Sequence, residues 1–210
     1  MPTMSWSKDP STISQNYQAK HGRNPLGPLF MWATYAVEAL YYLEDLDKTQ
    51  AIPTNFNSPH HPDTVDMAHV RWATTTAITA LDLCAAALGR RYCGWTSDKE
   101  LSLQSFKPRS EDGKALRPLL RKYPQAMKWV DDVRQDPRYK IVRAARNPLT
   151  HSTLIRHFTL IAGPSTIPDP RIAFKVNGKP IEAGALVTTA RDLAGEHVNA
   201  FLLVIDTLTK

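Results

Sequence analysis

Residues 29–46, LFMWATYAVEALYYLEDL, are apolar around nearly the whole circumference of a helix and decide the fold class. Such a segment is typical of a central helix that is buried on most faces. A second periodic segment follows a proline-containing loop: Asp63 or Thr64 can cap it, its apolar stripe continues to Leu88, and Gly89 ends it. Two long apolar helices therefore predict a helical core.

The composition is that of one globular domain. The chain has 210 residues, of which 42% are hydrophobic and 22% charged, which excludes a wholly disordered or fibrous chain. The longest apolar stretch, residues 28–43, is too short to cross a bilayer, and residues 1–15 lack the pattern of a secretory signal. Two cysteines, Cys84 and Cys93, argue against a disulfide framework or a structural zinc site. We expect a cytoplasmic protein without a membrane segment.

Periodicity divides the chain into an arm and one domain. Residues 1–25 have no apolar period and predict a flexible N-terminal arm, whereas residues 26–210 predict the helical domain. Residues 89–121 are polar and basic, and they are compatible with either a functional loop or short helices. Pro124 and Pro137 are placed to begin helices that continue to about Gln135 and Arg146.

The pattern near the C-terminus changes from helical to alternating. Residues 154–161 are rich in β-formers, and Ile172, Phe174 and Val176 alternate with polar or small residues before the turn dipeptide Asn177-Gly178. A β-flap is therefore expected within residues 153–183, followed by a final helix over about 187–208. The predicted fold is all-α, an up-and-down bundle of four to five helices with a small β-hairpin insertion before the last helix.

A basic segment carries the candidate chemistry. Between Pro137 and Pro168 there is no Asp or Glu, and the positive potential there favours an anionic ligand such as phosphate. A solvated helix face is the alternative interpretation. The candidate phosphate-binding or RNA-binding residues are Lys140, Arg143 and Arg156; Arg138, His151 and His157 lie in the same segment.

Arg146 and His151 are the candidate catalytic pair. On a regular helix, residues five apart diverge by roughly 140°. Pro148 cannot donate to the carbonyl of Ala144, so we expect the helix to kink or end there and to bring the pair together. Arg146 can then bind a phosphate and His151 can transfer a proton near neutral pH. These two groups are the minimum needed to cleave RNA without a metal.

Residues 142–151, VRAARNPLTH, closely resemble the signature of the HEPN superfamily: an Arg, a polar residue that is usually Asn, three variable positions and a His. The resemblance implies a bundle of four or five helices and a metal-independent endoribonuclease, often a toxin or defence effector, with no cofactor. It implies that Arg146 and His151 are catalytic and that Asn147 orients them or binds the scissile phosphate. It also implies a homodimer in which two motifs face each other, and a possible antitoxin or other regulatory partner.

Two positions depart from the family pattern. Pro148 is not expected inside the motif, and Thr153 stands where some toxin members carry a Tyr that receives a regulatory modification. The helix of residues 29–46 is a candidate dimer interface, although burial in the core explains its composition equally well.

Two further groups of residues have both a structural and a functional interpretation. A set of potential metal ligands lies at the start of the second long helix: His60, His61, Asp63, Asp66 and His69. The prolines on either side of the two neighbouring histidines indicate an exposed turn, and Asp63 is placed to cap the helix. No metal site is therefore predicted. Most aromatic residues in the apolar segments are predicted to be core: Trp32, Tyr35, Tyr41, Tyr42, Trp72 and Trp129. Trp95 is the better candidate for stacking on a base.

Two other classes of function remain open at this point. The chain is compatible with a catalytically silent module that binds nucleotides or RNA through the same basic segment. It is also compatible with a structural, partner-binding helical protein in which Arg146 caps carbonyl groups and His151 is a satisfied histidine. The motif and its basic surroundings together favour an RNA substrate. We expect attack of the 2′-hydroxyl to cleave it and to leave a 2′,3′-cyclic phosphate.

Overall fold

A computed structural model describes residues 4–21, 27–49, 61–96, 100–150, 158–159, 172–176 and 179–209. The described part is mostly helical, which confirms the all-α fold class. Its helices are α1 (Pro10–His21), α2 (Gly27–Thr49), α3 (His61–Tyr92), the 3-10 helix η1 (Leu103–Phe106), α4 (Glu111–Leu120), α5 (Pro124–Gln135), α6 (Pro137–Thr150) and α7 (Ala183–Thr209).

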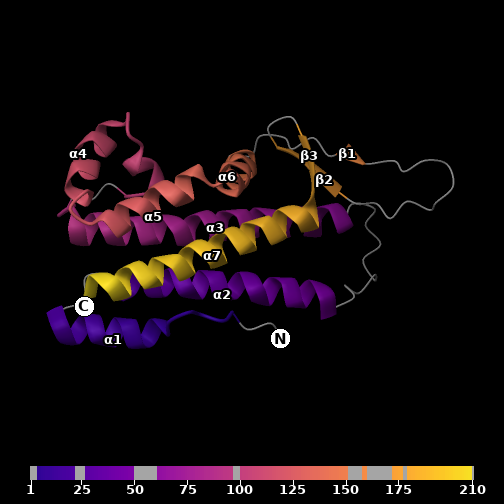
Figure 1. Cartoon of the computed structure of the whole chain (residues 1–210). Helices are drawn as coiled ribbons and strands as arrows, with labels where there is room; N and C mark the ends of the chain where they lie inside the picture. Colours follow the sequence, from indigo (N-terminus) through magenta and orange to yellow (C-terminus); the bar gives the residue numbers. More distant parts are fainter. Residues whose placement is uncertain are drawn as a thin grey trace.

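Three long helices, α2, α3 and α7, lie side by side and form the body of the molecule (Figure 1). Helix α3 packs against α2, α7 and α6. Its Ala73, Ala77, Leu81 and Leu88 are completely buried. The segment Ala68–Tyr92 of α3 is long and apolar enough to cross a membrane by length and composition, but 67% of its apolar 18-residue window is buried inside the fold. That burial is typical of a core helix.

The N-terminal segment differs from its prediction. Residues 10–21 form helix α1 instead of part of a flexible arm, and Ile13 and Tyr17 are buried against the core. The phenol oxygen of Tyr17 accepts a hydrogen bond from Nε of Arg91 at the end of α3, and the Arg91 guanidinium also lies over the Tyr17 ring. Two buried residues in an otherwise polar helix give no apolar period, so the sequence contained no visible signal for α1.

The prediction that the aromatic residues are core is wrong for four of them. Trp129 is buried and Tyr41 is partly buried, but the side chains of Trp32, Tyr35 and Tyr42 on α2 are more than half exposed. Trp72 on α3 is 41% exposed. Helix α2 contacts α1, α3 and α7 on its other sides, so its aromatic side faces solvent in the chain considered alone.

Residues 89–121 contain short helices, one of the two possibilities that the sequence left open. Leu101, Leu103 and Phe106 anchor the segment around η1 in the core. Two glycines permit close packing here: a Cβ on Gly89 would lie 2.3 Å from Leu101 Cδ1, and one on Gly113 would lie 1.9 Å from the carbonyl oxygen of Lys107. The segment before α4 is therefore held closely against the helices.

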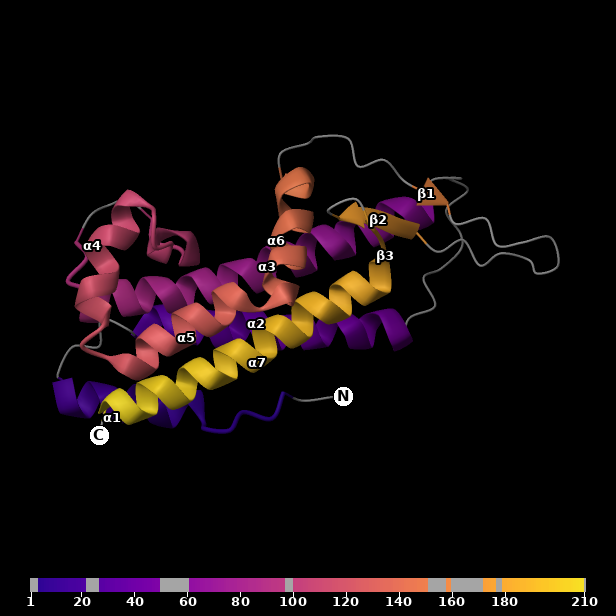
Figure 2. The ribbon, with the colours of Figure 1, turned by 45° about the horizontal axis from the view of Figure 1, so that its top comes forward.

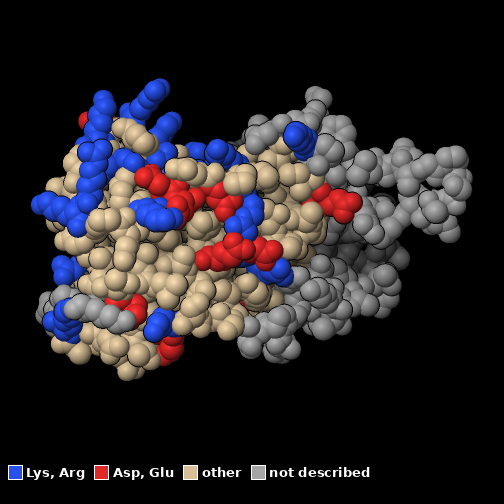
Figure 3. Space-filling model, viewed as in Figure 1, with Lys and Arg blue, Asp and Glu red and all other residues tan. Residues whose placement is uncertain are grey.

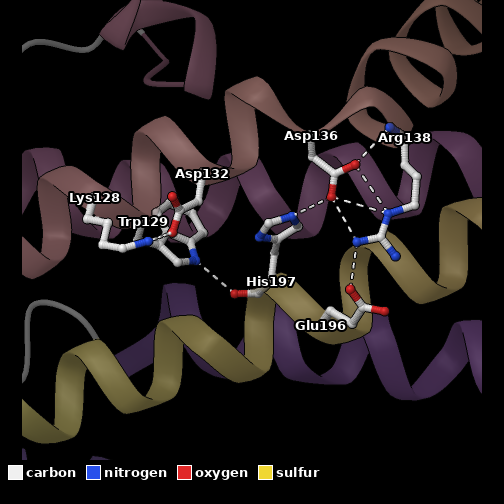
Figure 4. Close-up of polar contacts among 7 residues, drawn as sticks. All are labelled: Lys128, Trp129, Asp132, Asp136, Arg138, Glu196 and His197. Atoms are coloured by element: carbon white, nitrogen blue, oxygen red, sulfur yellow. Dashed lines mark hydrogen bonds and ion pairs between the residues drawn. The ribbon is translucent and has the colours of Figure 1, made fainter.

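Helices α5 and α6 meet at Asp136, which ends one helix and caps the next. Its carboxylate accepts a hydrogen bond from the backbone N–H of Arg138, with Pro137 at the first helical position. The same carboxylate binds the Arg138 guanidinium and lies 2.9 Å from His197 Nε2 on α7, and Arg138 also reaches Glu196 (Figure 4). These contacts tie the start of α6 to the middle of α7, and α6 then rises steeply across α3 (Figure 2).

Helix α6 continues to Thr150, so of the two predicted outcomes, a kink or an end near Pro148, the end is wrong. A proline removes a single backbone hydrogen bond, here the bond to the Ala144 carbonyl, and this loss falls in the last turn of the helix. The helix therefore continues through residue 150.

A small antiparallel sheet precedes α7. Strand β2 (Ile172–Val176) pairs with β3 (Lys179–Glu182), and β1 (Phe158–Thr159) pairs with the other edge of β2. The strand predicted from the alternation of Ile172, Phe174 and Val176 is confirmed. Val176 pairs with Lys179, which leaves two residues between the strands, while the Asn177-Gly178 turn lies outside the described residues.

Gly113→Ala should strongly destabilise the fold, whereas Gly184→Ala should not. The new methyl group at position 113 would overlap the Lys107 carbonyl, and overpacking against backbone typically costs about 1–3 kcal/mol or more. Gly184, in the first turn of α7, has open space where its Cβ would lie, so alanine there should stabilise by about 0.4–1 kcal/mol. Urea denaturation measures both, and equal effects would contradict the close packing of the segment before α4.

The Asp136 cluster should make stability depend on pH in the acid range. Burial alone would raise the pKa of Asp136, but hydrogen bonds from Arg138 and His197 outweigh it and lower the pKa from 3.8 to about 2. The unfolded chain therefore binds a proton first as the pH falls, and about 1–2 kcal/mol of stability should be lost between about pH 4 and pH 2. Asp136→Asn should reduce this loss in thermal melts. Asp132→Asn, which breaks the exposed Asp132–Lys128 pair, should retain it.

Candidate functional site

Helix α6 places the basic residues of the motif region at the edge of the core. Tyr139, Val142 and Ala145 are buried, and they recur at helical spacing on the side of α6 that packs inward. Arg143 and Arg146 follow Tyr139 by four and seven residues and are partly exposed. Residues at these spacings lie along one side of a helix, so Tyr139, Arg143 and Arg146 form one row.

This row lines an open cavity of about 500 Å³, which we call the Arg146 cavity. Its walls come from three parts of the chain: α3, the segment that leads into and includes η1, and α6. Three arginines, Arg90, Arg143 and Arg146, line it together with two carboxylates, Asp82 and Glu100. Ser102, Gln104 and Tyr139 add neutral hydrogen-bonding groups. The cavity therefore offers both charge and polar groups to a small polar ligand.

Asp82 holds the three walls together. Its Oδ1 accepts a hydrogen bond from the backbone N–H of Leu103 at 2.9 Å, and its Oδ2 lies 3.9 Å from Arg146 Nη1. Burial raises the pKa of Asp82, although the Leu103 amide and the positive charges of Arg146 and Arg143 lower it in part. The carboxylate thus fixes the η1 segment on α3 and supplies a counter-charge to the motif arginine.

A second cavity of about 410 Å³, the Arg134 cavity, adjoins the first. Gln104, Tyr139 and Arg143 line both cavities, so these residues form the boundary between them. Gln104 Nε2 donates a hydrogen bond to the Tyr139 hydroxyl at 2.9 Å across this boundary. The remaining lining residues of the Arg134 cavity are Lys107, Arg134, Lys140 and Ala144. On the face shown in Figure 3, Lys and Arg side chains gather over the region of α4.

The structure places some of the predicted site residues and leaves others undescribed. Arg146 lines the first cavity, Lys140 the second, and Arg143 both. The side chain of Asn147, and His151 and Arg156 entirely, lie outside the described residues. The basic segment is also less uniformly positive than its sequence indicates, because Arg138 is paired with Asp136 and Glu196.

Several cavity residues were missed by sequence reasoning. Asp82 had a visible signal: it is a single carboxylate within the apolar run of residues 77–88, where a charge needs a partner. Gln104, Lys107, Arg134 and Tyr139 had none, because each is an ordinary residue of a polar or amphipathic segment. Only the packing of η1 against α6 brings them together.

The remaining candidate residues lie elsewhere. Trp95 is partly buried against the core and lines neither of these cavities. Of the potential metal ligands, His69 is the only one whose side chain is described, and no group of three or more His, Cys, Asp or Glu able to hold a metal occurs within the described residues. Comparison with protein-family models, with curated proteins and with solved structures found no match.

Asp82→Asn should stabilise the protein at neutral pH and strengthen anion binding. The pKa of Asp82 is raised above 3.8 in the folded state, so the free energy of unfolding falls as the pH rises and Asp82 ionises. Asparagine does not ionise and therefore avoids this loss. Its side-chain oxygen can still accept the hydrogen bond from the Leu103 N–H. Loss of the negative charge 3.9 Å from the Arg146 guanidinium should lower the Kd for single-stranded RNA by about two- to fivefold. Thermal melts and fluorescence anisotropy measure the two effects.

Glu100→Gln is the control for Asp82→Asn. It removes one negative charge from the same cavity, but Glu100 is exposed, so it should leave the melting temperature nearly unchanged. An equal rise in melting temperature for both variants would show that the buried position of Asp82 is not the cause.

Proposed function

We propose that this chain is a metal-independent endoribonuclease of the HEPN type, with Arg146 and His151 as its catalytic residues. The observation that carries the proposal is the position of Arg146: the motif arginine lines an open cavity together with Arg143 and Arg90. A guanidinium group in such a cavity can bind a phosphate through two parallel hydrogen bonds. In this proposal the helices α2, α3, α5, α6 and α7 correspond to the four- to five-helix bundle, and the β2–β3 pair corresponds to the flap before the last helix.

The proposed reaction is an internal transfer at phosphorus. The 2′-hydroxyl loses its proton to a base and its oxygen bonds to phosphorus, while the bond from phosphorus to the 5′-oxygen breaks. The 5′-oxygen takes up a proton, so the products are a 2′,3′-cyclic phosphate and a 5′-hydroxyl, and no water or oxidant is consumed. His151 moves the protons, Arg146 stabilises the charge on the phosphate oxygens, and Asn147 orients the pair. Arg143 and Arg156 add positive potential.

The partners follow from the same proposal. A homodimer would complete the cleft with a second motif, and the exposed aromatic side of α2, with Trp32, Tyr35 and Tyr42, offers an apolar surface for a second copy. An antitoxin or another regulatory partner would control activity in the cytoplasm.

A non-catalytic module that binds nucleotides or RNA is the second candidate. The observation that favours it is the mixture of groups in the Arg146 cavity: Glu100, Ser102 and Gln104 can recognise the edge of a base while the arginines bind phosphate. This candidate predicts salt-dependent binding without turnover.

Cleavage of RNA in the presence of EDTA is the decisive measurement. Wild-type protein should produce ends with a 2′,3′-cyclic phosphate. His151→Ala should lower the rate by about 10²–10⁴-fold because proton transfer is lost. Arg146→Ala should lower it by about 10²–10³-fold because charge on the phosphate is no longer stabilised. Melting temperatures of both variants serve as the folding control.

Two outcomes would contradict the enzyme proposal. Intact RNA after incubation with folded wild-type protein, combined with RNA binding, would favour the binding module. Strong destabilisation by both alanine substitutions, with no effect of RNA or phosphate on the wild-type melting temperature, would favour a structural role for Arg146 and His151.

A further inference from the structure

The Arg134 cavity differs from the Arg146 cavity in its charge. Positive residues line both, but Asp82 and Glu100 face the first cavity, whereas the residues described around the second include no carboxylate. Lys107, Arg134, Lys140 and Arg143 contribute four positive charges around about 410 Å³. None of the four forms an ion pair with a described residue. Within the described part of the chain, this cavity is therefore a concentration of positive charge without a counter-charge of its own.

Arg134 is the central observation. Its Nη1 donates to the carbonyl oxygen of Phe106 at 3.1 Å, but its Nε is buried and has no hydrogen-bond partner among the described residues. The nearest compensating carboxylate is already occupied, because Asp131 binds Arg117 through two hydrogen bonds of 2.8 and 3.1 Å. Arg117 also donates to the Phe106 carbonyl, so two guanidinium groups share one carbonyl. Burial and the repulsion of Arg117 lower the pKa of Arg134.

Tyr139 adds a neutral donor at the boundary between the cavities. Its hydroxyl oxygen accepts from Gln104, which leaves the hydroxyl hydrogen without an acceptor among the described residues. A phosphate group suits this environment, because its oxygens accept from guanidinium, ammonium and hydroxyl donors together.

The geometry points to the Arg134 cavity as a second phosphate subsite, which binds the phosphate next to the scissile one on the same single-stranded RNA. This inference rests on the proposed function, in which the Arg146 cavity receives the scissile phosphate. Arg143 and Tyr139 line both cavities, so they lie between two successive phosphates of the bound strand. The substrate class is therefore an oligonucleotide with consecutive phosphates rather than a mononucleotide.

The test measures binding of a short 2′-O-methyl RNA, which lacks the attacking hydroxyl and remains intact. Fluorescence anisotropy gives the affinity as a function of salt concentration for the wild type and for the double variant Lys107→Ala/Lys140→Ala. Both lysines are exposed, so the variant should fold. Because the subsite binds one phosphate, its loss should reduce the slope of log affinity against log salt by about 0.7 for a single strand.

Lys114→Ala/Lys122→Ala is the matched control. It removes the same charge from exposed lysines on and just after α4 that do not line the Arg134 cavity, so its slope should equal that of the wild type. Equal slopes for the two double variants would overturn the subsite. Arg134→Gln, which can still donate to the Phe106 carbonyl, should weaken binding of the 2′-O-methyl RNA. A folded Arg134→Gln protein with wild-type affinity would also overturn the subsite.

Failure of the enzyme proposal gives a different result. A protein that binds this RNA with the expected change in slope but leaves natural RNA intact has the subsite without the catalysis. A protein that cleaves RNA in EDTA but shows the same slope for both double variants has the catalysis without the subsite.

Discussion

The burial of α3 is the constraint on which the rest of the structure depends. This helix contacts α2, α6, α7 and the η1 segment, so its neighbours must each present an apolar side to it. Asp82 is a partly buried carboxylate on this helix, and it needs compensation because burial disfavours its charged form. The Leu103 amide and Arg146 provide that compensation. The same contacts that satisfy Asp82 therefore position η1 and α6 and shape the Arg146 cavity.

The sequence predicted the elements whose signals are local. Pro124 and Pro137 mark the starts of α5 and α6, and the alternation before Asn177 predicted β2. It did not predict α1, where Ile13 and Tyr17 are buried only because α2, α7 and Arg91 form a surface for them. It also placed the aromatic residues of α2 in the core, because apolar periodicity does not show how many neighbours a helix has. Tertiary contacts decided both cases.

The candidate site was predictable to the extent that it lies on one helix. The charge pattern identified Lys140, Arg143 and Arg146, which are three and six residues apart on α6. Asp136 and Glu196 neutralise Arg138, and they come from the α5–α6 junction and from α7, so the segment alone could not show that pairing. The same holds for Lys107 and Arg134, which reach the Arg134 cavity from two other elements. A site assembled from several elements has only part of its signal in any one motif.

The distance to the nearest carboxylate separates the arginines that connect helices from the arginines that line the cavities. Arg138 and Arg117 are each bound by carboxylates through short hydrogen bonds, and both connect one helix to another. Arg146 has a more distant carboxylate, at 3.9 Å, which a phosphate can replace because the pair is partly exposed. Arg134 is partly buried, and its Nε lies buried without a hydrogen-bond partner among the described residues, an arrangement that costs stability in the protein alone. An anion that enters the Arg134 cavity would offset that cost by accepting hydrogen bonds from the guanidinium.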